Sequence, residues 1–131
     1  MILQQRVIFG DTDQMGVVYY GNYLRYFEAA RAAFLRHKGK SHKDLDAWNV
    51  ALPVYEAHCQ YRRPAHYEDL LDVEVRVTEL RGASMRFDYE IRRDGEVLAT
   101  GWTVHACVDR DGRPRRVPRE LRDLIGALPS I

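Results

Sequence analysis

Cysteine is scarce in this sequence and long apolar runs are missing. The two cysteines, Cys59 and Cys107, are too few for a disulfide framework, and we expect both to be reduced thiols buried within strands. No apolar segment approaches the roughly 20 residues of a membrane-spanning helix, so no membrane span is expected. Residues 1–6 lack the charged, apolar and small-residue succession of a signal peptide, which predicts a cytoplasmic protein.

An excess of charge of either sign is also absent. Lys and Arg total 20 and Asp and Glu total 19, which leaves a net charge of +1. A nucleic-acid duplex is held through many phosphate contacts, so we expect no nucleic-acid partner. The five histidines show no zinc spacing, and Met15 takes the third ligand position of the calcium-like pattern Asp11-x-Asp13-x-x-Gly16. No metal site and no cofactor are therefore predicted.

The 131 residues fit one compact domain over residues 1–131. Apolar residues recur at helical spacing over 22–39, which predicts one long helix. Asn22 is a favoured N-cap, and Gly39 suits the C-terminal end.

Downstream, the apolar period changes to two. This alternation predicts three antiparallel strands over 71–77, 85–91 and 98–108, the last two joined by a hairpin turn at Asp94-Gly95. Shorter strands are expected at 7–9 and 54–61. A short terminal helix is expected after Pro118, with the apolar residues Leu121, Leu124, Ile125 and Leu128.

These elements predict an α+β fold in which a curved antiparallel sheet of about five strands wraps one long central helix. A sheet with one apolar face needs a cover, and the sequence offers only one large helix. Sheet edges are commonly closed by pairing with a second copy, so we expect a homodimer, or a homotetramer built from dimers.

The densest cluster of chemically suggestive residues lies at 9–23, between the first strand and the long helix. Free N–H groups and the helix dipole converge at a helix start and favour anionic intermediates there. An aspartate at such a place can activate water or attack an acyl carbon itself. Turn formation and capping are the structural alternative for Asp11 and Asp13.

This loop, which reads FGDTDQMGVVYYGNYL and runs into Phe27-Glu28-Ala29-Ala30-Arg31, resembles the hotdog-fold acyl-CoA thioesterases. The closest similarity is to the 4-hydroxybenzoyl-CoA thioesterase family and its relatives near the Tol-Pal genes. The segment Tyr61-Arg62-Arg63-Pro64 and the turn around Gly82-Ala83-Ser84 fall where that family has similar features.

The resemblance implies hydrolysis of an acyl-CoA thioester to a free carboxylic acid and CoA. It implies that Asp13 is the catalytic carboxylate, as general base or nucleophile, and that the backbone N–H of Tyr20 is the donor to the thioester carbonyl. Asp11 is expected to be structural. Many relatives near the Tol-Pal genes carry histidine where this chain has Tyr20. The tyrosine excludes a proton relay through histidine here, and the resemblance does not say which acyl group is cleaved.

Coenzyme A is a polyanion, so its binding site needs cationic side chains. Arginine is well suited because its planar guanidinium can donate two parallel hydrogen bonds to a phosphate. We expect Arg81 with Ser84 to be the substrate-binding pair, and the pair Arg62-Arg63 is a further candidate. Tyr26 is a candidate for the acyl pocket.

Two other functions are weighed against hydrolysis. The same fold could serve as a non-catalytic module that binds acyl-CoA as a sensor. A hotdog dehydratase would need a histidine and an acid at the site, and no histidine lies between Met1 and Phe34.

Overall fold

The computed structural model describes residues 1–126. By contacts the chain forms two compact units. The first comprises Met1–Phe34, Cys59–Val75 and Tyr89–Gly101, and the second Leu35–His58, Arg76–Asp88 and the described residues from Trp102 onward. Four strands contribute residues to both units, and one domain over 1–131 stays a prediction.

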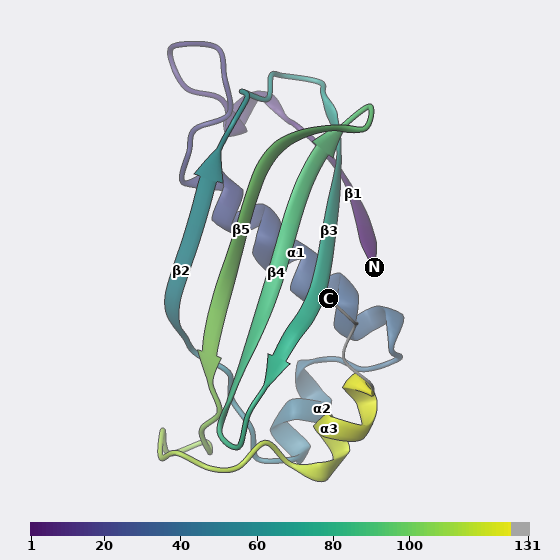
Figure 1. Ribbon diagram of the computed structural model, residues 1–131, viewed down its shortest axis with the longest axis vertical. Helices are drawn as coiled ribbons and strands as arrows, with labels where there is room; N and C mark the ends of the chain where they lie inside the picture. Colours follow the sequence, from purple (N-terminus) through teal and green to yellow (C-terminus); the bar gives the residue numbers. More distant parts are fainter. Residues whose placement is uncertain (127–131) are drawn as a thin grey trace. The chain divides into compact units, whose positions relative to one another are not determined.

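Five strands form one sheet in the order β1-β3-β4-β5-β2 (Figure 1). Their bounds are Ile2–Arg6 (β1), Val54–Tyr61 (β2), Leu70–Leu80 (β3), Ser84–Arg93 (β4) and Glu96–Ala106 (β5). The helices are η1 (Phe9–Asp11, a 3-10 turn), α1 (Asn22–His37), α2 (His42–Ala47) and α3 (Arg119–Ile125). The predicted α+β class, with a five-stranded antiparallel sheet and one long helix, is confirmed.

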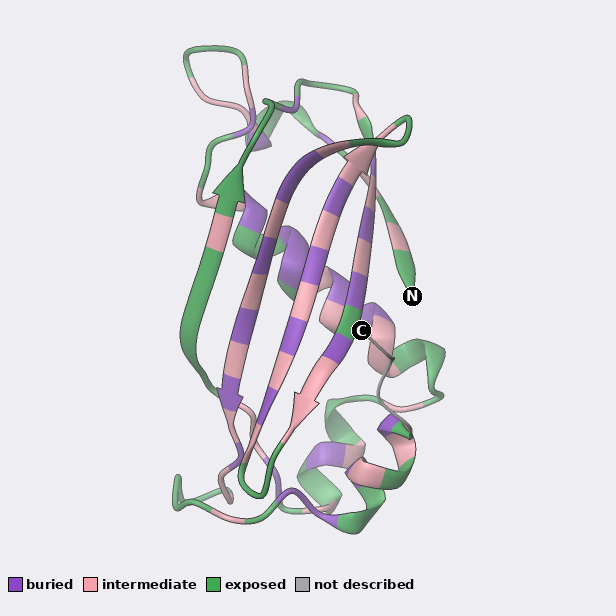
Figure 2. Ribbon diagram, viewed as in Figure 1, coloured by how far each residue is buried: buried purple, intermediate pink, exposed green. Residues whose placement is uncertain are grey.

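Burial follows the period of two in the central strands β3 and β4, whereas β2 is exposed along most of its length (Figure 2). In β3 and β4 every second residue is buried, namely Leu71, Val73, Val75, Val77, Met85, Phe87, Tyr89 and Ile91. In the first unit Phe27 of α1 stacks on Tyr89, with ring centroids 4.2 Å apart and planes 7° apart. The turn between β4 and β5 has Asp94 at φ 51° and Gly95 at φ 83°, as the predicted type I′ hairpin requires.

The first strand differs from the prediction, because it spans Ile2–Arg6 and not residues 7–9. It pairs antiparallel with β3, from Ile2 opposite Glu74 to Arg6 opposite Leu70. The chain then leaves the sheet since the buried carboxylate of Asp11 accepts a hydrogen bond from the Ile8 N–H at 3.3 Å and closes the turn η1.

The long helix also ends differently. Asn22 is its first residue and not an N-cap. Its Nδ2 donates to the Asp11 carbonyl at 2.9 Å, and its Oδ1, the atom a cap would use, accepts from the Arg25 guanidinium at 3.2 Å. The helix stops at His37, and Gly39, at φ 76°, donates its N–H to the Arg36 carbonyl.

The cysteines, helix α2 and the end of the chain complete the comparison with the predicted elements. Cys107 is buried but lies just past β5, and Cys59 in β2 is only partly buried; both are free thiols. Helix α2 was not predicted. Leu128 lies outside the described residues.

Candidate active site

The loop between β1 and α1 is organised around Asp11, whose side chain is buried. Its carboxylate accepts hydrogen bonds from the Tyr26 hydroxyl at 2.9 Å and from the Arg25 guanidinium at 3.3 Å. Its backbone carbonyl accepts from the Tyr19 N–H and the Asn22 side chain, both at 2.9 Å. Asp11 therefore ties the loop to the first turns of α1, which agrees with its expected structural role.

Asp13 lies two residues further on, in a tight turn that leaves its carboxylate half-buried. Oδ1 accepts from the Met15 N–H at 2.8 Å, and the Asp13 N–H donates to the Val17 carbonyl at 2.9 Å. Gly16 closes the turn at φ 81°, a left-handed conformation that suits glycine. Oδ2 of Asp13 accepts from no group of residues 1–126. One oxygen positions the side chain and the other is available for chemistry.

Tyr20 stands immediately before α1. Its carbonyl accepts from the Tyr61 hydroxyl at 2.9 Å and from the Tyr23 N–H at 3.3 Å. Its own N–H has no hydrogen-bond partner within the described part of the chain. Burial, and then the neighbouring Cys59 thiol, raises the pKa of Tyr61, so this hydroxyl stays protonated as a donor. The helix start thus offers an exposed amide on a fixed backbone.

A cleft of about 250 Å³ opens beside this helix start. Its walls are apolar, aromatic and cationic, and comprise Val17, Val18, Tyr20, Tyr23, Tyr61, Arg62, Arg63 and Pro64. Asp13 is joined to this wall through its hydrogen bond to Val17. An apolar cleft with a few polar groups is the usual form of a small-molecule site.

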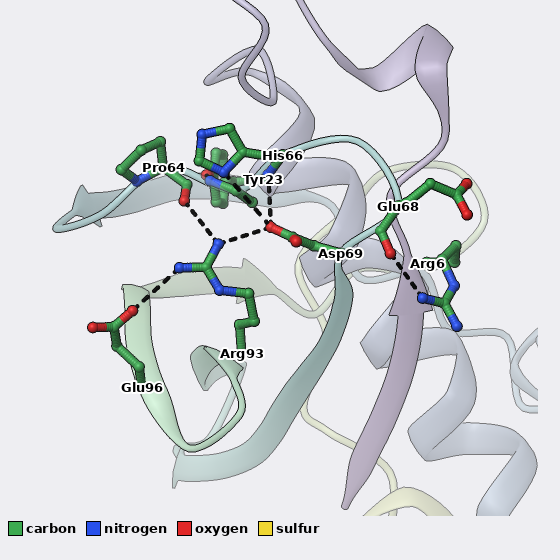
Figure 3. Close-up of polar contacts among 9 residues, drawn as sticks. Arg6, Tyr23, Pro64, His66, Glu68, Asp69, Arg93 and Glu96 are labelled. Carbon is green, nitrogen blue, oxygen red and sulfur yellow. Dashed lines mark hydrogen bonds and ion pairs between the residues drawn. The ribbon is translucent and has the colours of Figure 1, made fainter.

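Arg93, which contacts the cleft wall at Pro64, is ion-paired with Asp69 (Figure 3). Asp69 accepts from the Arg93 guanidinium and from the His66 N–H, each at 2.8 Å. Arg93 also donates to the Pro64 carbonyl at 3.4 Å and to Glu96 at 3.2 Å. Partial burial alone would raise the pKa of Asp69, but the His66 N–H and Arg93 outweigh it and leave this pKa lowered.

Replacing Asp69 by Asn is expected to reduce the free energy of unfolding by about 1–3 kcal/mol at pH 7, because the part-buried Arg93 guanidinium loses the closer of its two carboxylate partners and keeps only Glu96. The folded-state pKa of Asp69 is depressed, so the carboxylate contributes stability above the ordinary carboxyl pKa of about 4. This contribution is lost as the pH falls from there through the folded-state pKa.

Urea unfolding of both proteins at pH 7 and pH 3 measures the effect. The difference in the free energy of unfolding between wild-type protein and Asp69→Asn should be smaller at pH 3 than at pH 7. Asp94→Asn, in the exposed β4–β5 turn, is the control and should change neither value. An Asp69→Asn effect of equal size at both pH values would contradict the ion-pair account.

The predicted site residues fall into two groups. Asp13, Tyr20 and Tyr26 belong to the first unit, and of these three only Tyr20 lines the cleft. Asp13 adjoins it through its hydrogen bond to Val17, and Tyr26 is buried against Asp11. Burial and the Asp11 carboxylate raise the pKa of Tyr26. Arg81 and Ser84 belong to the second unit, where the Arg81 N–H donates to the Ser84 carbonyl at 2.9 Å. The Arg81 guanidinium is exposed and lies 3.6 Å from Glu79.

Sequence reasoning missed two contacts of this site. The hydroxyl of Tyr61 reaches a carbonyl 41 positions away, and Arg93 reaches Asp69 across 24 positions. The segment Tyr61-Arg62-Arg63-Pro64 was visible as a motif, but no local spacing signals either contact.

No group of three or more His, Cys, Asp or Glu side chains within residues 1–126 is placed to hold a metal ion. None of the helices in the same residues has the length and apolar character to cross a membrane.

Comparisons with known proteins agree with the resemblance seen in the sequence. The profile of the thioesterase-like superfamily matches residues 7–125. The chain is 34% identical to the acyl-CoA thioester hydrolase YbgC of Escherichia coli, over 88% of each chain. It is 35% identical to a 1,4-dihydroxy-2-naphthoyl-CoA hydrolase of Synechococcus elongatus, over 91% of this chain and 90% of the relative.

A solved structure of a related thioesterase has the same fold. A 1,4-dihydroxy-2-naphthoyl-CoA thioesterase from Synechocystis superimposes with a TM-score of 0.87 at 26% identity, covering 95% of this chain and 93% of the other. The predicted hotdog fold is confirmed by such neighbours. The chain belongs to the thioesterase-like superfamily.

Proposed function

We propose that this protein hydrolyses acyl-CoA thioesters, with the carboxylate of Asp13 as general base or nucleophile and the N–H of Tyr20 as the donor to the developing oxyanion. Its curated relatives are named as acyl-CoA thioester hydrolases and match it over nearly their whole length, so the chain is an enzyme of this class. The observation that supports this assignment is that one loop carries both a carboxylate oxygen of Asp13 and an N–H of Tyr20 that have no hydrogen-bond partner among the described residues.

The chemistry follows from these two groups. As a base, Asp13 takes a proton from a water molecule, and the resulting hydroxide attacks the thioester carbon. As a nucleophile, Asp13 attacks that carbon itself and forms a mixed anhydride, which water then cleaves. In both routes the C–S bond breaks, the thiolate of CoA leaves and takes up a proton, and the acid is released. The Tyr20 N–H and the α1 dipole stabilise the oxyanion.

Other parts of the proposal rest on charge. Arg81 with Ser84 would contact the CoA phosphates, since the Arg81 guanidinium is exposed beside a strand turn. Tyr26 is assigned to holding the loop and not to substrate, because its hydroxyl is engaged by Asp11. Self-association as a homodimer or homotetramer and a cytoplasmic location stay predictions.

Release of free thiol from acetyl-, hexanoyl-, benzoyl- and palmitoyl-CoA, followed with a thiol dye, tests the activity. Benzoyl-CoA belongs in the panel because three tyrosines line the cleft. We expect turnover of at least one thioester. Tight binding of one of them without thiol release from any would instead favour a binding module.

Replacing Tyr61 by Phe is expected to lower kcat about threefold to tenfold with KM nearly unchanged. This variant keeps the ring packing on Tyr20 and Tyr23 but removes the hydrogen bond to the Tyr20 carbonyl, which is worth about 0.5–1.5 kcal/mol. Tyr61 is thus a positioning residue for the Tyr20 amide.

The matched control is Tyr55→Phe, on the same strand and 62% exposed, which should leave both kinetic constants at wild-type values. Steady-state kinetics on the best thioester of the panel measures the effect. A rise in KM at constant kcat in Tyr61→Phe would show that Tyr61 contacts substrate and does not position Tyr20.

A further inference from the structure

Two arginines, Arg62 and Arg63, line the cleft, and Arg93 contacts its wall at the Pro64 carbonyl. Arg63 and Arg93 are ion-paired within the chain. Arg63 lines the cleft, and its Nε lies 3.2 Å from a carboxylate oxygen of Glu96. Arg93 stands behind the wall and is paired with Asp69 at 2.8 Å. These two cations therefore have carboxylate partners before any ligand binds.

Arg62 differs from both. Its backbone N–H donates to the Leu98 carbonyl at 2.9 Å, which fixes the residue in the cleft wall. Its side chain is exposed, and its guanidinium forms no hydrogen bond or ion pair with another of the described residues. The net charge of the chain is only +1, so the protein as a whole does not attract anions strongly. The unpaired Arg62 guanidinium therefore favours a negatively charged group in the cleft.

Two tyrosine hydroxyls of the cleft already have partners within the chain. The Tyr61 hydroxyl donates to the Tyr20 carbonyl, and the Tyr23 hydroxyl accepts from the Ala65 N–H at 3.4 Å. A ligand that enters the cleft therefore meets apolar walls, aromatic rings, the free N–H of Tyr20 and one guanidinium that has no carboxylate partner among the described residues. A guanidinium of this kind matches a carboxylate by two parallel hydrogen bonds.

We infer that Arg62 makes the enzyme selective for acyl groups that carry a carboxylate at their far end. This inference rests on the proposed function, because it places the thioester at Tyr20. Arg62 and Tyr20 line the same cleft of about 250 Å³, so an anion held by Arg62 lies within a short acyl chain of the thioester carbonyl. The CoA phosphates are separated from that carbonyl by the long pantetheine arm, which places the bound charge on the acyl side.

The test compares adipyl-CoA with hexanoyl-CoA, two six-carbon thioesters that differ by the terminal carboxylate. In wild-type protein kcat/KM should favour adipyl-CoA. Arg62→Gln should reduce kcat/KM for adipyl-CoA about 10- to 100-fold and leave hexanoyl-CoA nearly unchanged, as expected for loss of a charge-assisted hydrogen bond. Arg62→Lys should retain part of the preference. The charge-matched control is Arg36→Gln, at the exposed end of α1, which should change neither substrate.

The same acyl groups on pantetheine, which lacks the CoA diphosphate, distinguish the two sources of negative charge. The Arg62→Gln loss should persist with adipyl-pantetheine. A loss that is equal for adipyl- and hexanoyl-CoA and disappears with the pantetheine thioesters would mean that Arg62 holds a CoA phosphate, and the inference would be overturned. Unchanged constants for all four thioesters would overturn it as well.

Failure of the proposed function gives a different result. No hydrolysis of any thioester by wild-type protein would refute the activity and leave the charge preference measurable by calorimetry. Adipyl-CoA should then bind wild-type protein about 10- to 100-fold more tightly than it binds Arg62→Gln, with hexanoyl-CoA bound equally by both. Equal affinities for adipyl-CoA would refute the role of Arg62.

Discussion

Asp13→Asn is expected to lower kcat by a factor on the order of 10² to 10⁴, the usual contribution of a positioned acid or base. The free energy of unfolding should change by less than about 0.5 kcal/mol. The structural contact of this side chain is the hydrogen bond that Oδ1 accepts from the Met15 N–H, and an asparagine oxygen can accept the same bond. The substitution therefore removes the charged oxygen at Oδ2 and leaves the turn in place.

Asp94→Asn is the matched control for this variant, because it removes one carboxylate from an exposed turn of the same unit. Asparagine tolerates the φ of 51° found at that position. Kinetics with the best thioester of the panel, together with CoA binding by calorimetry, should show lost turnover and unchanged affinity for Asp13→Asn alone. Near-parental turnover of Asp13→Asn on every thioester would refute Asp13 as the catalytic carboxylate.

Much of the fold could be predicted because its signals are local. The period-two alternation from Leu71 to Val77 and from Met85 to Ile91 reports one buried face, and the structure buries those residues. Asp94-Gly95 fixes the hairpin because both residues accept a positive φ. Helix α1 follows from its apolar face, and only its ends differ from the prediction.

The errors arise where a distant or buried polar group overrides the local pattern. The apolar residues at 7–9 predict a strand, but the Asp11 carboxylate draws the Ile8 N–H into a turn. Asn22 has the composition of an N-cap, yet its side chain is used by the Asp11 carbonyl. Both errors involve Asp11, whose carboxylate accepts from Ile8 and whose backbone carbonyl accepts from Asn22.

The candidate site also has features that local sequence could predict and features that depend on the fold. The position of Asp13 and Tyr20 in a loop before a helix could be inferred from the sequence, whereas the free state of Oδ2 and of the Tyr20 N–H depends on which partners the fold supplies. The Tyr61 hydroxyl and the Asp69–Arg93 ion pair come from segments far apart in the chain. Only coordinates could reveal that they support the same cleft.

Asp11→Ala is expected to reduce the free energy of unfolding by about 2–4 kcal/mol, because it leaves the Ile8 N–H and the buried Tyr26 hydroxyl without their acceptor. Asp11→Asn should cost only about 1 kcal/mol. Its amide oxygen can replace Oδ2 as acceptor for both groups, and the lost ion pair to Arg25 is largely solvent-exposed on the arginine side.

Urea unfolding curves with equal slopes for the three proteins would give these differences directly. The contrast with Asp13 is the decisive result. Asp11→Asn should keep most of its turnover with a small loss of stability, whereas Asp13→Asn should keep its stability and lose its turnover. If Asp11→Asn instead lost turnover as severely as Asp13→Asn at unchanged stability, the first aspartate would belong to the reaction and the division of roles within the loop would be wrong.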